Sequence, residues 1–490
     1  GFALRGITAY DNSGWRVSRG GDVNNDGIND IFISAWKGDP NGGASGESYI
    51  VYGSDTPFPP EFLLNTIDGT NGIQINGVGG GDHSGVSISD LGDVNNDGID
   101  DILVGAYKAD ISASQASNGE SYVVFGNAAL PHPFQLSSLN GTNGFMMTGE
   151  EKGDFSGYSV SGAGDFNNDG LNDILIGAYK ANVLRASNQA DAGESYIVYG
   201  SAAAFPAVLP LSSIDGTNGC LIQGVLKNDR SGFSVSAGGD INGDDIDDVL
   251  IGAYQVKVGI NAKAGATYAV FGSATPPDTI DLSTLDGSNG FTINGIDKAD
   301  FSAYAVNGPG DVNQDGFADI LIGAWKAKVR RDNKNLSKAG ETYLVYGSAS
   351  PSAVVSLDSL DGTNGFLVEG ADKNHRLGLA LSGIGDINGD GGADYAMGAP
   401  FAKVEVNGEK RNKAGITYIV FGKPSGQACG AGRPGPCETD ITPPVLNCPT
   451  GLVSGCGSVV VPAVQATDDC NVTVTSFPNA GAVLPAGTVS

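Results

Sequence analysis

The sequence predicts an all-β fold made of repeated sheets, and three observations lead to this prediction. Glycine supplies 76 of the 490 residues, about double its average share, which indicates many tight turns. Short runs rich in Ile, Val, Tyr and Phe alternate with clusters of Gly, Asn and Asp, a pattern typical of strands and turns. The third observation is an internal repeat, which decides the architecture.

The repeat is clearest in an acidic block, Asp22-Val-Asn-Asn-Asp-Gly-Ile-Asn-Asp30. Close copies begin at Asp93, Asp165, Asp240, Asp311 and Asp386, at intervals of 71, 72, 75, 71 and 75 residues. A second block, Leu-Asp-Gly-Thr-Asn-Gly-Phe at 360–366, also has variants in the other units. A period this long indicates one multi-stranded unit repeated around a ring, as in the blades of a β-propeller.

Within one unit, four strands can be predicted from composition. In the third unit they are 158–161, 173–179, 194–199 and 220–223. The first three strands of this set occur six times along the chain, whereas the fourth follows only the first five sets. We therefore expect a six-bladed propeller of four-stranded blades over residues 1–422.

The copy of the fourth strand that is missing after the sixth set is found at the start of the chain. Gly1-Phe-Ala-Leu-Arg-Gly6 resembles the fourth strand of the other units. We expect this N-terminal strand to complete the sixth blade and close the ring, which removes exposed sheet edges. The alternative is that residues 1–6 end a preceding blade, which would give seven blades or more.

Each acidic block has the spacing D-x-N-x-D-G-x-x-D, except that Asp245 replaces the glycine of the fourth. Oxygens on alternate residues of a tight loop converge on one point, and a mostly oxygen shell with three carboxylates favours Ca²⁺. We therefore expect about six calcium ions, one in each blade. The predicted ligands are Asp22, Asn24, Asp26, Ile28 (carbonyl) and Asp30; Asp93, Asn95, Asp97, Ile99 and Asp101; Asp165, Asn167, Asp169, Leu171 and Asp173; Asp240, Asn242, Asp244, Ile246 and Asp248; Asp311, Asn313, Asp315, Phe317 and Asp319; and Asp386, Asn388, Asp390, Gly392 and Asp394.

An EF-hand needs a glutamate at position twelve, where these loops have Ile, Val or Met, so a loop within a β-hairpin is expected instead. The loops, together with Ser156-Gly157-Tyr-Ser-Val160 and Gly398-Ala399-Pro400, resemble the FG-GAP repeats of integrin α-subunit propellers. The resemblance covers residues 1–422. It implies an extracellular calcium-binding propeller that serves in adhesion, although integrin propellers have seven blades and carry the loop in only some of them.

The end of the chain differs in composition from the repeats. Residues 423–440 are a Gly/Pro-rich linker, and 441–490 resemble part of a hyalin repeat, a small immunoglobulin-like β-sandwich. Five of the six cysteines lie here and suggest disulfides, with a zinc site as the alternative: Cys429, Cys437, Cys448, Cys456 and Cys470. Cys220 stands alone in a predicted strand and is expected to be a buried hydrophobic residue.

Charge and motifs restrict the function. The formal net charge of −28 argues against nucleic acid and anionic lipid as partners, and no apolar run is long enough to span a bilayer. The chain has no motif of a nucleophilic hydrolase, a zinc protease or a phosphate-binding loop, so a non-enzymatic role is expected. A calcium-assisted polysaccharide lyase is the catalytic alternative, because a Lys or Tyr base leaves no motif.

Basic residues gather in two loops, 326–338 and 403–413. The resemblance to FG-GAP propellers implies that these loops lie on the face opposite the calcium loops. We expect this patch to bind an acidic protein or an anionic glycan, although it is equally a solvated loop that balances nearby carboxylates. The residues expected to carry the interaction are Arg330, Arg331, Lys334, Lys410 and Arg411. A structural alternative is a subunit that self-assembles into an extracellular filament or matrix.

Overall fold

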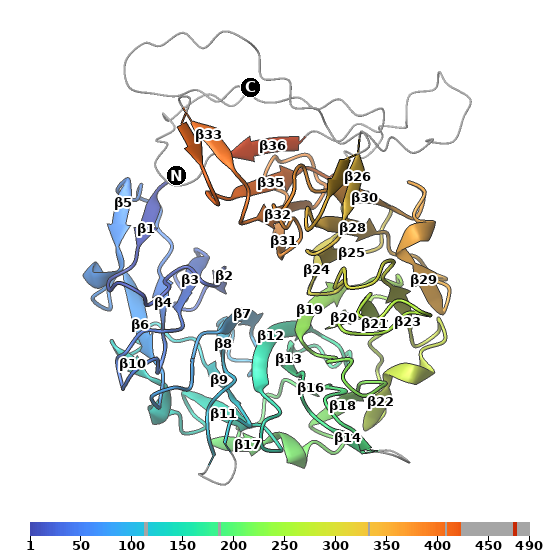
Figure 1. The fold of residues 1–490 in the computed structure, drawn as a ribbon. Coiled ribbons are helices and arrows are strands. Elements are labelled where there is room, and N and C mark those ends of the chain that lie inside the picture. Colours follow the sequence, from blue (N-terminus) through green and yellow to red (C-terminus); the bar gives the residue numbers. More distant parts are fainter. Residues whose placement is uncertain (112–115, 185–187, 332–333, 407–408, 423–473, 478–490) are drawn as a thin grey trace.

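Six sheets are arranged around a ring, which confirms the all-β class and the six-bladed propeller (Figure 1). The structure is a computed structural model that describes residues 1–111, 116–184, 188–331, 334–406, 409–422 and 474–477. Its helices in these ranges are five single 3₁₀ turns, and none of them is long and apolar enough to cross a membrane. They are η1 (Leu64–Thr66), η2 (Leu136–Ser138), η3 (Leu211–Ser213), η4 (Leu282–Thr284) and η5 (Leu357–Ser359).

Each blade is an antiparallel sheet of four strands, and the first strand of each sheet is the innermost. Blade 1 contains β2 (Val17–Gly21), β3 (Asp30–Ala35), β4 (Glu47–Val51) and β6 (Gly72–Asn76). Blade 2 contains β7 (Ser87–Gly92), β8 (Asp101–Ala106), β9 (Glu120–Val124) and β11 (Gly144–Thr148). Blade 3 contains β12 (Ser156–Gly164), β13 (Asp173–Ala178), β16 (Glu194–Val198) and β18 (Gly219–Gln223).

The second half of the ring repeats this order. Blade 4 contains β19 (Ser234–Gly239), β20 (Asp248–Ala253), β21 (Ala266–Val270) and β23 (Gly290–Asn294). Blade 5 contains β24 (Ala305–Gly310), β25 (Asp319–Ala324), β28 (Glu341–Val345) and β30 (Gly365–Glu369). Blade 6 contains β31 (Ala380–Gly385), β32 (Asp394–Ala399), β35 (Ile416–Val420) and β36 (Val474–Phe477).

Short additional strands join neighbouring repeats, a feature that the sequence did not predict. Blades 1 to 4 each gain a fifth strand, which comes from the following repeat and pairs in parallel with the outermost strand. These strands are β10 (Phe134–Gln135), β17 (Val208–Pro210), β22 (Thr279–Asp281) and β29 (Val354–Ser356). Three small ribbons lie in the loops between second and third strands: β14–β15 (Val183–Leu184 and Asn188–Gln189), β26–β27 (Val329–Arg331 and Lys334–Leu336) and β33–β34 (Val404–Val406 and Glu409–Arg411).

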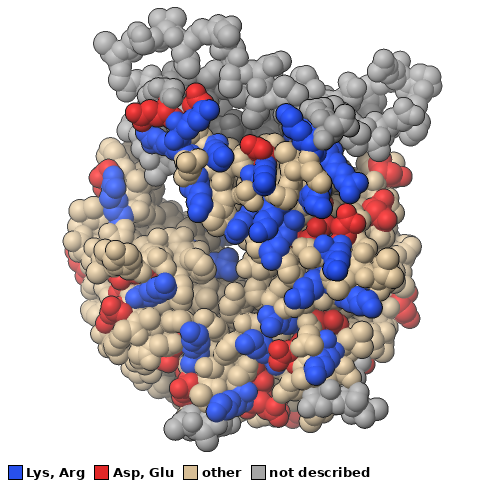
Figure 2. All heavy atoms as spheres, in the orientation of Figure 1, with Lys and Arg blue, Asp and Glu red and all other residues tan. Residues whose placement is uncertain are grey.

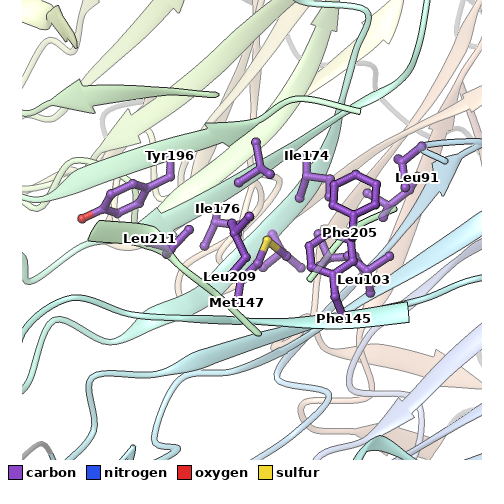
Figure 3. Close-up of a cluster of buried hydrophobic side chains, with 14 of the residues drawn as sticks. Leu91, Leu103, Phe145, Met147, Ile174, Ile176, Tyr196, Phe205, Leu209 and Leu211 are labelled. Carbon is purple, nitrogen blue, oxygen red and sulfur yellow. The ribbon is translucent and has the colours of Figure 1, made fainter. Parts of the chain in front are cut away.

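The hydrophobic core lies between blades rather than inside any one of them. Figure 3 shows one core cluster, in which Leu103 and Phe145 of blade 2 pack with Ile174 and Ile176 of blade 3. Equivalent clusters join the other successive blades from blade 1 to blade 6. Because a neighbour covers each face, the second strands of blades 1 to 5 are apolar almost throughout instead of alternating. Cys220 is fully buried in one of these clusters, as predicted.

The completion of the sixth blade differs from the sequence prediction. The N-terminal strand β1 (Ala3–Arg5) pairs in parallel with β5 (Glu61–Leu63) of the first repeat, and the fourth place in blade 6 is taken by β36. Since one edge of β35 can hold only one partner, the presence of β36 excludes β1 from it. In blade 2, the fourth strand β11 pairs in parallel with β17, as where Met146 lies opposite Val208. β1 pairs with β5 in the equivalent way, with Ala3 opposite Glu61, so β1 has the outer partner of a fourth strand.

The contact between blades 6 and 1 is also weaker than the others. On the face of blade 1 that is turned away from blade 2, the core cluster contains Phe2, Leu4 and Phe62 but no described residue of blade 6. Val17 is 64% exposed, whereas its counterparts Ile88 and Val160 are 7% and 5% exposed. Among the residues that the structure describes, the ring is therefore packed at five blade junctions and open at the sixth.

Successive blades approach so closely that several second strands need glycine. A Cβ on Gly177 of β13 would lie 2.1 Å from the carbonyl oxygen of Gly232 in the next blade. Gly105 and Gly323 meet the same obstacle, with distances of 2.1 Å and 2.0 Å to the following blade. These glycines set the spacing between blades because the contact is with backbone that no rotamer change can move.

We expect Gly177→Ala to destabilise the propeller by about 2–3 kcal/mol, because the added methyl group forces blades 3 and 4 apart. Gly43→Ala is the matched control, since a Cβ there has no neighbour within 4 Å. Thermal unfolding followed by circular dichroism checks both variants. Equal melting temperatures for the two would contradict the argument.

Candidate functional site: acidic loops and the opposite basic face

All six acidic blocks form the loop of the hairpin between the first and second strands of a blade, as predicted. Two residues of each loop adopt a positive φ, at positions four and six; in blade 1 they are Asn25 at 58° and Gly27 at 86°. In the fourth loop, position six is Asp245 at 64°, a conformation that Asp tolerates better than most residues. The substitution of glycine by Asp245 therefore leaves the loop conformation intact.

The side chains at positions one, three and five face a common centre. In blade 1, the amide of Asp26 donates to Asp22 Oδ1 at 2.9 Å and to Asn24 Oδ1 at 3.1 Å, so both oxygens lie beside the same nitrogen. Asn24 Nδ2 in turn donates to Asp26 Oδ2 at 2.8 Å. The same three contacts recur in the other five loops. The structure thus brings these eighteen predicted residues together, three to a loop.

The aspartate at position nine has a different environment. Asp30 is 3% exposed, and its two oxygens accept hydrogen bonds from the amides of Val23 and Gly53, at 3.1 and 2.8 Å. Burial, aided by the charges of Asp26 and Asp22, raises the pKa of Asp30 to about 7 in spite of these two hydrogen bonds. In blade 2, burial is again the largest cause that raises the pKa of Asp101, to about 8. The position-nine carboxylate is therefore buried and joins the loop to its own blade through hydrogen bonds to backbone amides. We call this carboxylate the strap of the loop.

The partner of this strap is a glycine that the loop motif does not include. In each blade, the third strand is followed by an aromatic residue and then by glycine. The amide of that glycine donates to the position-nine carboxylate of the same blade. The glycine is required because a Cβ on Gly126 would lie 2.3 Å from the carbonyl oxygen of Asp100. The recurring Tyr-Gly or Phe-Gly pair is the sequence signal that could have revealed it.

The loops also connect one blade to the next. The amide of Asn127, next to this glycine in blade 2, donates to the carbonyl of Val23 in the first loop at 2.8 Å. Asp100 of the second loop accepts from the amide of Asp22 at 2.8 Å. The acidic loops are therefore part of the junctions between blades.

The donor set fits a hard cation such as Ca²⁺. Each loop offers two carboxylates and an amide oxygen around one centre, with a third carboxylate behind them, which is the oxygen-rich chemistry that Ca²⁺ requires. Within the described ranges, no three Asp, Glu, His or Cys side chains are already gathered in the geometry of a bound metal. Instead, the loop oxygens accept hydrogen bonds from loop amides, and the carbonyls at position seven are not part of this network.

The opposite face of the ring carries a belt of aromatic side chains. An aromatic residue follows the second strand of blades 1 to 5, at Trp36, Tyr107, Tyr179, Tyr254 and Trp325. Rings from the loops before the first strands lie between them, as where His83 contacts both Trp36 and Tyr107, at 4.6 and 5.6 Å between centroids. Further contacts continue the belt as far as Trp325. Trp36 and Trp325 are only partly exposed within this belt.

Basic side chains cover this belt. Lys180 Nζ lies 4.2 Å from the ring centroid of Phe155, and Lys326 Nζ lies 3.9 Å from that of Phe301. Arg376 lies 4.1 Å from the ring of Phe401. Figure 2 shows that Lys and Arg gather on one face over blades 4 to 6, whereas Asp and Glu lie mainly at the periphery. We call this surface the lysine face.

The five residues predicted to carry an interaction lie on two ribbons of blades 5 and 6. Arg330, Arg331 and Lys334 belong to β26–β27, and Lys410 and Arg411 belong to β34. Arg331 is engaged in a salt bridge with Glu369 at 3.5 Å, whereas the other four side chains are exposed. The five tail cysteines predicted to form disulfides, together with the linker, fall outside the described residues.

The fold and the loops define a class: a β-propeller with an acidic hairpin loop in every blade. Residues 86–124, 156–198 and 231–270 match the family model described as FG-GAP repeat. These segments correspond to the first three strands of blades 2, 3 and 4. They support an FG-GAP, integrin-like propeller.

Similar proteins include integrin α-subunits. The chain is 26% identical to integrin alpha-5 of Xenopus laevis over 236 residues, which are 48% of this chain and 19% of that protein. It is 27% identical to integrin alpha pat-2 of Caenorhabditis elegans over 248 residues, 50% of this chain and 18% of that protein. It is also 34% identical to phosphatidylinositol-glycan-specific phospholipase D of Bos taurus over 117 residues, 24% of this chain and 13% of that protein. The alignments thus span less than a fifth of each relative's length.

The two kinds of loop aspartate should respond differently to truncation when no metal is present. Asp101→Ala leaves the buried amides of Val94 and Gly126 without an acceptor, so we expect a loss of about 2–4 kcal/mol in excess EDTA. Asp97→Ala removes an exposed position-five side chain and should change the stability in EDTA very little. Denaturant unfolding of both variants measures the difference, and equal losses would refute the assignment of position nine as a strap.

Proposed function

We propose that the chain is an extracellular, calcium-stabilised propeller that serves as an adhesion or ligand-interaction module of a larger surface protein. The observation that carries the proposal is the division of the ring into two faces. One face holds six oxygen-lined loops that contribute to the blade junctions, and the other holds an aromatic belt covered by basic side chains. The first arrangement suits metal-dependent stability, and the second suits recognition.

Calcium would act on stability in this proposal. Sites in extracellular modules bind Ca²⁺ with dissociation constants of about 10⁻⁴–10⁻³ M. At ~1 mM Ca²⁺, a site with a constant of ~10⁻⁴ M contributes roughly 1.4 kcal/mol, and six independent sites would contribute on the order of 8 kcal/mol. That sum is comparable to the net stability of a whole domain, so a low-calcium compartment would leave the propeller marginal.

The similarity to integrin α-subunits supports an interaction role rather than catalysis. The segments that match the family model form strands of the blades, and these strands serve as a scaffold. The sequence also lacks the catalytic motifs considered above. The match to phospholipase D covers 13% of that protein and gives no reason to transfer its activity. Two outcomes would favour the alternatives: turnover of an anionic polysaccharide would favour a lyase, and regular filaments in micrographs would favour a structural subunit.

We expect chelation to lower the melting temperature strongly, and we expect a titration of the metal-free chain to show about six calcium sites. Asp97→Asn keeps the side-chain shape but removes one ligand charge, so it should remove or weaken one site. Asp55→Asn removes the same charge from an exposed position outside the loops and is the matched control. Isothermal titration calorimetry and melting in excess EDTA measure these effects. An unchanged melting temperature in EDTA would contradict the proposal that calcium stabilises the propeller.

We further expect the immobilised chain to capture a ligand from a panel of purified extracellular matrix proteins and glycans, in ~1 mM Ca²⁺ but not in EDTA. The dependence follows because loss of calcium loosens the blades that hold the lysine face. Surface plasmon resonance with the same panel in both buffers makes the comparison. Absence of any specific ligand across the panel would count against an interaction module.

A further inference from the structure

We propose that a basic pocket between blades 4 and 5 on the lysine face binds an acidic sugar unit of an anionic polysaccharide. This inference rests on the proposed interaction function and names its ligand class. The pocket has a volume of about 500 Å³, within the range typical of small-molecule sites. Five basic side chains line it, Lys298 from the loop before β24 and four from the loop between β25 and β28: Lys326, Lys328, Arg330 and Lys338.

The walls of the pocket are held by backbone hydrogen bonds between the loops. The amide of Ala299 donates to the carbonyl of Ala262 at 3.0 Å, and the amide of Lys326 donates to the carbonyl of Asp300 at 3.2 Å. These contacts join the loop before β24 to the loops of both blades. The pocket is therefore formed before any ligand arrives, which reduces the entropic cost of binding.

The repeats within the chain act as internal controls for the lysines. The fourth residue after the second strand is Asp39, Asp110 or Asn182 in blades 1 to 3, but Lys257, Lys328 or Lys403 in blades 4 to 6. A second position, which has a positive φ just before the third strand, changes in the same way. It is Ala44, Ser117 or Asp191 in blades 1 to 3, but Lys263, Lys338 or Lys413 in blades 4 to 6.

In blades 1 to 3, these two positions stabilise the loop. Asp110 Oδ1 accepts from the amide of Ser117 at 2.5 Å, and Asn182 Oδ1 accepts from the amide of Asp191 at 3.2 Å. Lysine has no acceptor, so this hydrogen bond is lost in blades 4 to 6. Blades 4 to 6 therefore have a pair of cations where blades 1 to 3 have a stabilising hydrogen bond.

Salt bridges do not neutralise these cations in the part of the chain that the structure describes. The salt bridges found there belong to Arg5 and Arg331, and neither includes a pocket lysine. Lys326 faces three further cations, and its pKa is lowered by burial and by these like charges. The two carboxylates of the lining balance at most two of its five positive charges. Since close cations repel one another unless an anion lies among them, the arrangement calls for a ligand with negative charge.

The remaining lining residues favour a sugar over an acidic peptide. Asp297, Asp300, Asn261 and Ser337 add hydrogen-bonding groups suited to hydroxyls, and Ala299 is the apolar member of the lining. A peptide ligand would ordinarily use an apolar anchor or pair with a strand edge. A ring that bears both hydroxyls and a carboxylate or sulfate matches the mixture of cations and acceptors, and lysines of blades 4 and 6 could contact further units.

The test uses the full chain in Ca²⁺ and four probes: alginate, dextran sulfate, neutral dextran and polyglutamate. We expect binding to alginate or dextran sulfate, and which of them binds identifies the anion as carboxylate or sulfate. Lys328→Asp with Lys338→Ser gives blade 5 the pair that blade 2 already has, so the loop should remain folded. This double variant should bind the preferred polysaccharide about tenfold more weakly.

The matched control is the reverse exchange in blade 2, Asp110→Lys with Ser117→Lys, which should change the affinity by less than about twofold. A gain as large as the loss in blade 5 would overturn the proposal, because net charge would then explain binding. Equal binding of polyglutamate would overturn it as well. If the blade 5 variant does not fold, Lys298→Gln at an exposed position provides the second test and should weaken binding in the same direction.

Failure of the pocket and failure of the wider function can be told apart. If neither polysaccharide binds while the panel of matrix proteins and neutral glycans still yields a ligand, the inference about acidic sugars is wrong and the interaction role stands. If the panel yields no ligand either, the proposed function itself fails.

Discussion

The close packing of one blade against the next is the constraint on which the rest of the structure depends. A single blade is a four-stranded sheet with two apolar faces and cannot bury either of them alone. The clusters between blades supply that burial, and the backbone contact at Gly177 shows how closely the sheets must approach. Because a neighbouring blade covers each face, the acidic loops and the basic surface lie at the two ends of the strands.

Much of this architecture could be predicted from the sequence because the repeat supplies it six times. The period, the strands and the place of the acidic loops all follow from a pattern in which each copy corroborates the others. The end of the chain offers no such redundancy. The sequence of Gly1–Gly6 predicts its strand conformation correctly, but it reveals neither the parallel pairing with β5 nor that β36 occupies the edge of β35. Competition between two strands for one edge depends on tertiary context rather than on local pattern.

A similar limit applies to the candidate site. The spacing of the loop identifies Asp26 and Asp30 equally as oxygen donors, yet one is exposed and the other is buried against two backbone amides. The distinction depends on Gly53, which lies 23 residues away in the sequence. The aromatic belt could not be predicted for the same reason, because its rings come from two loops in each blade that only the packing of neighbouring blades brings together.

The distribution of charge follows from the same geometry. Eighteen of the 55 acidic residues are the aspartates at positions one, five and nine of the six loops, so much of the negative charge is confined to one end of the strands. Because the two ends are separated by the length of a strand, which exceeds a Debye length, this charge is largely screened from the opposite face. Lysines can therefore accumulate there without forming salt bridges to the loops. The overall net charge of −28 thus gives no guide to the ligand. The repeats of a propeller allow each blade to vary its surface loops independently while its strands remain fixed by packing, and in blades 4 to 6 that freedom has produced a basic surface on an acidic protein.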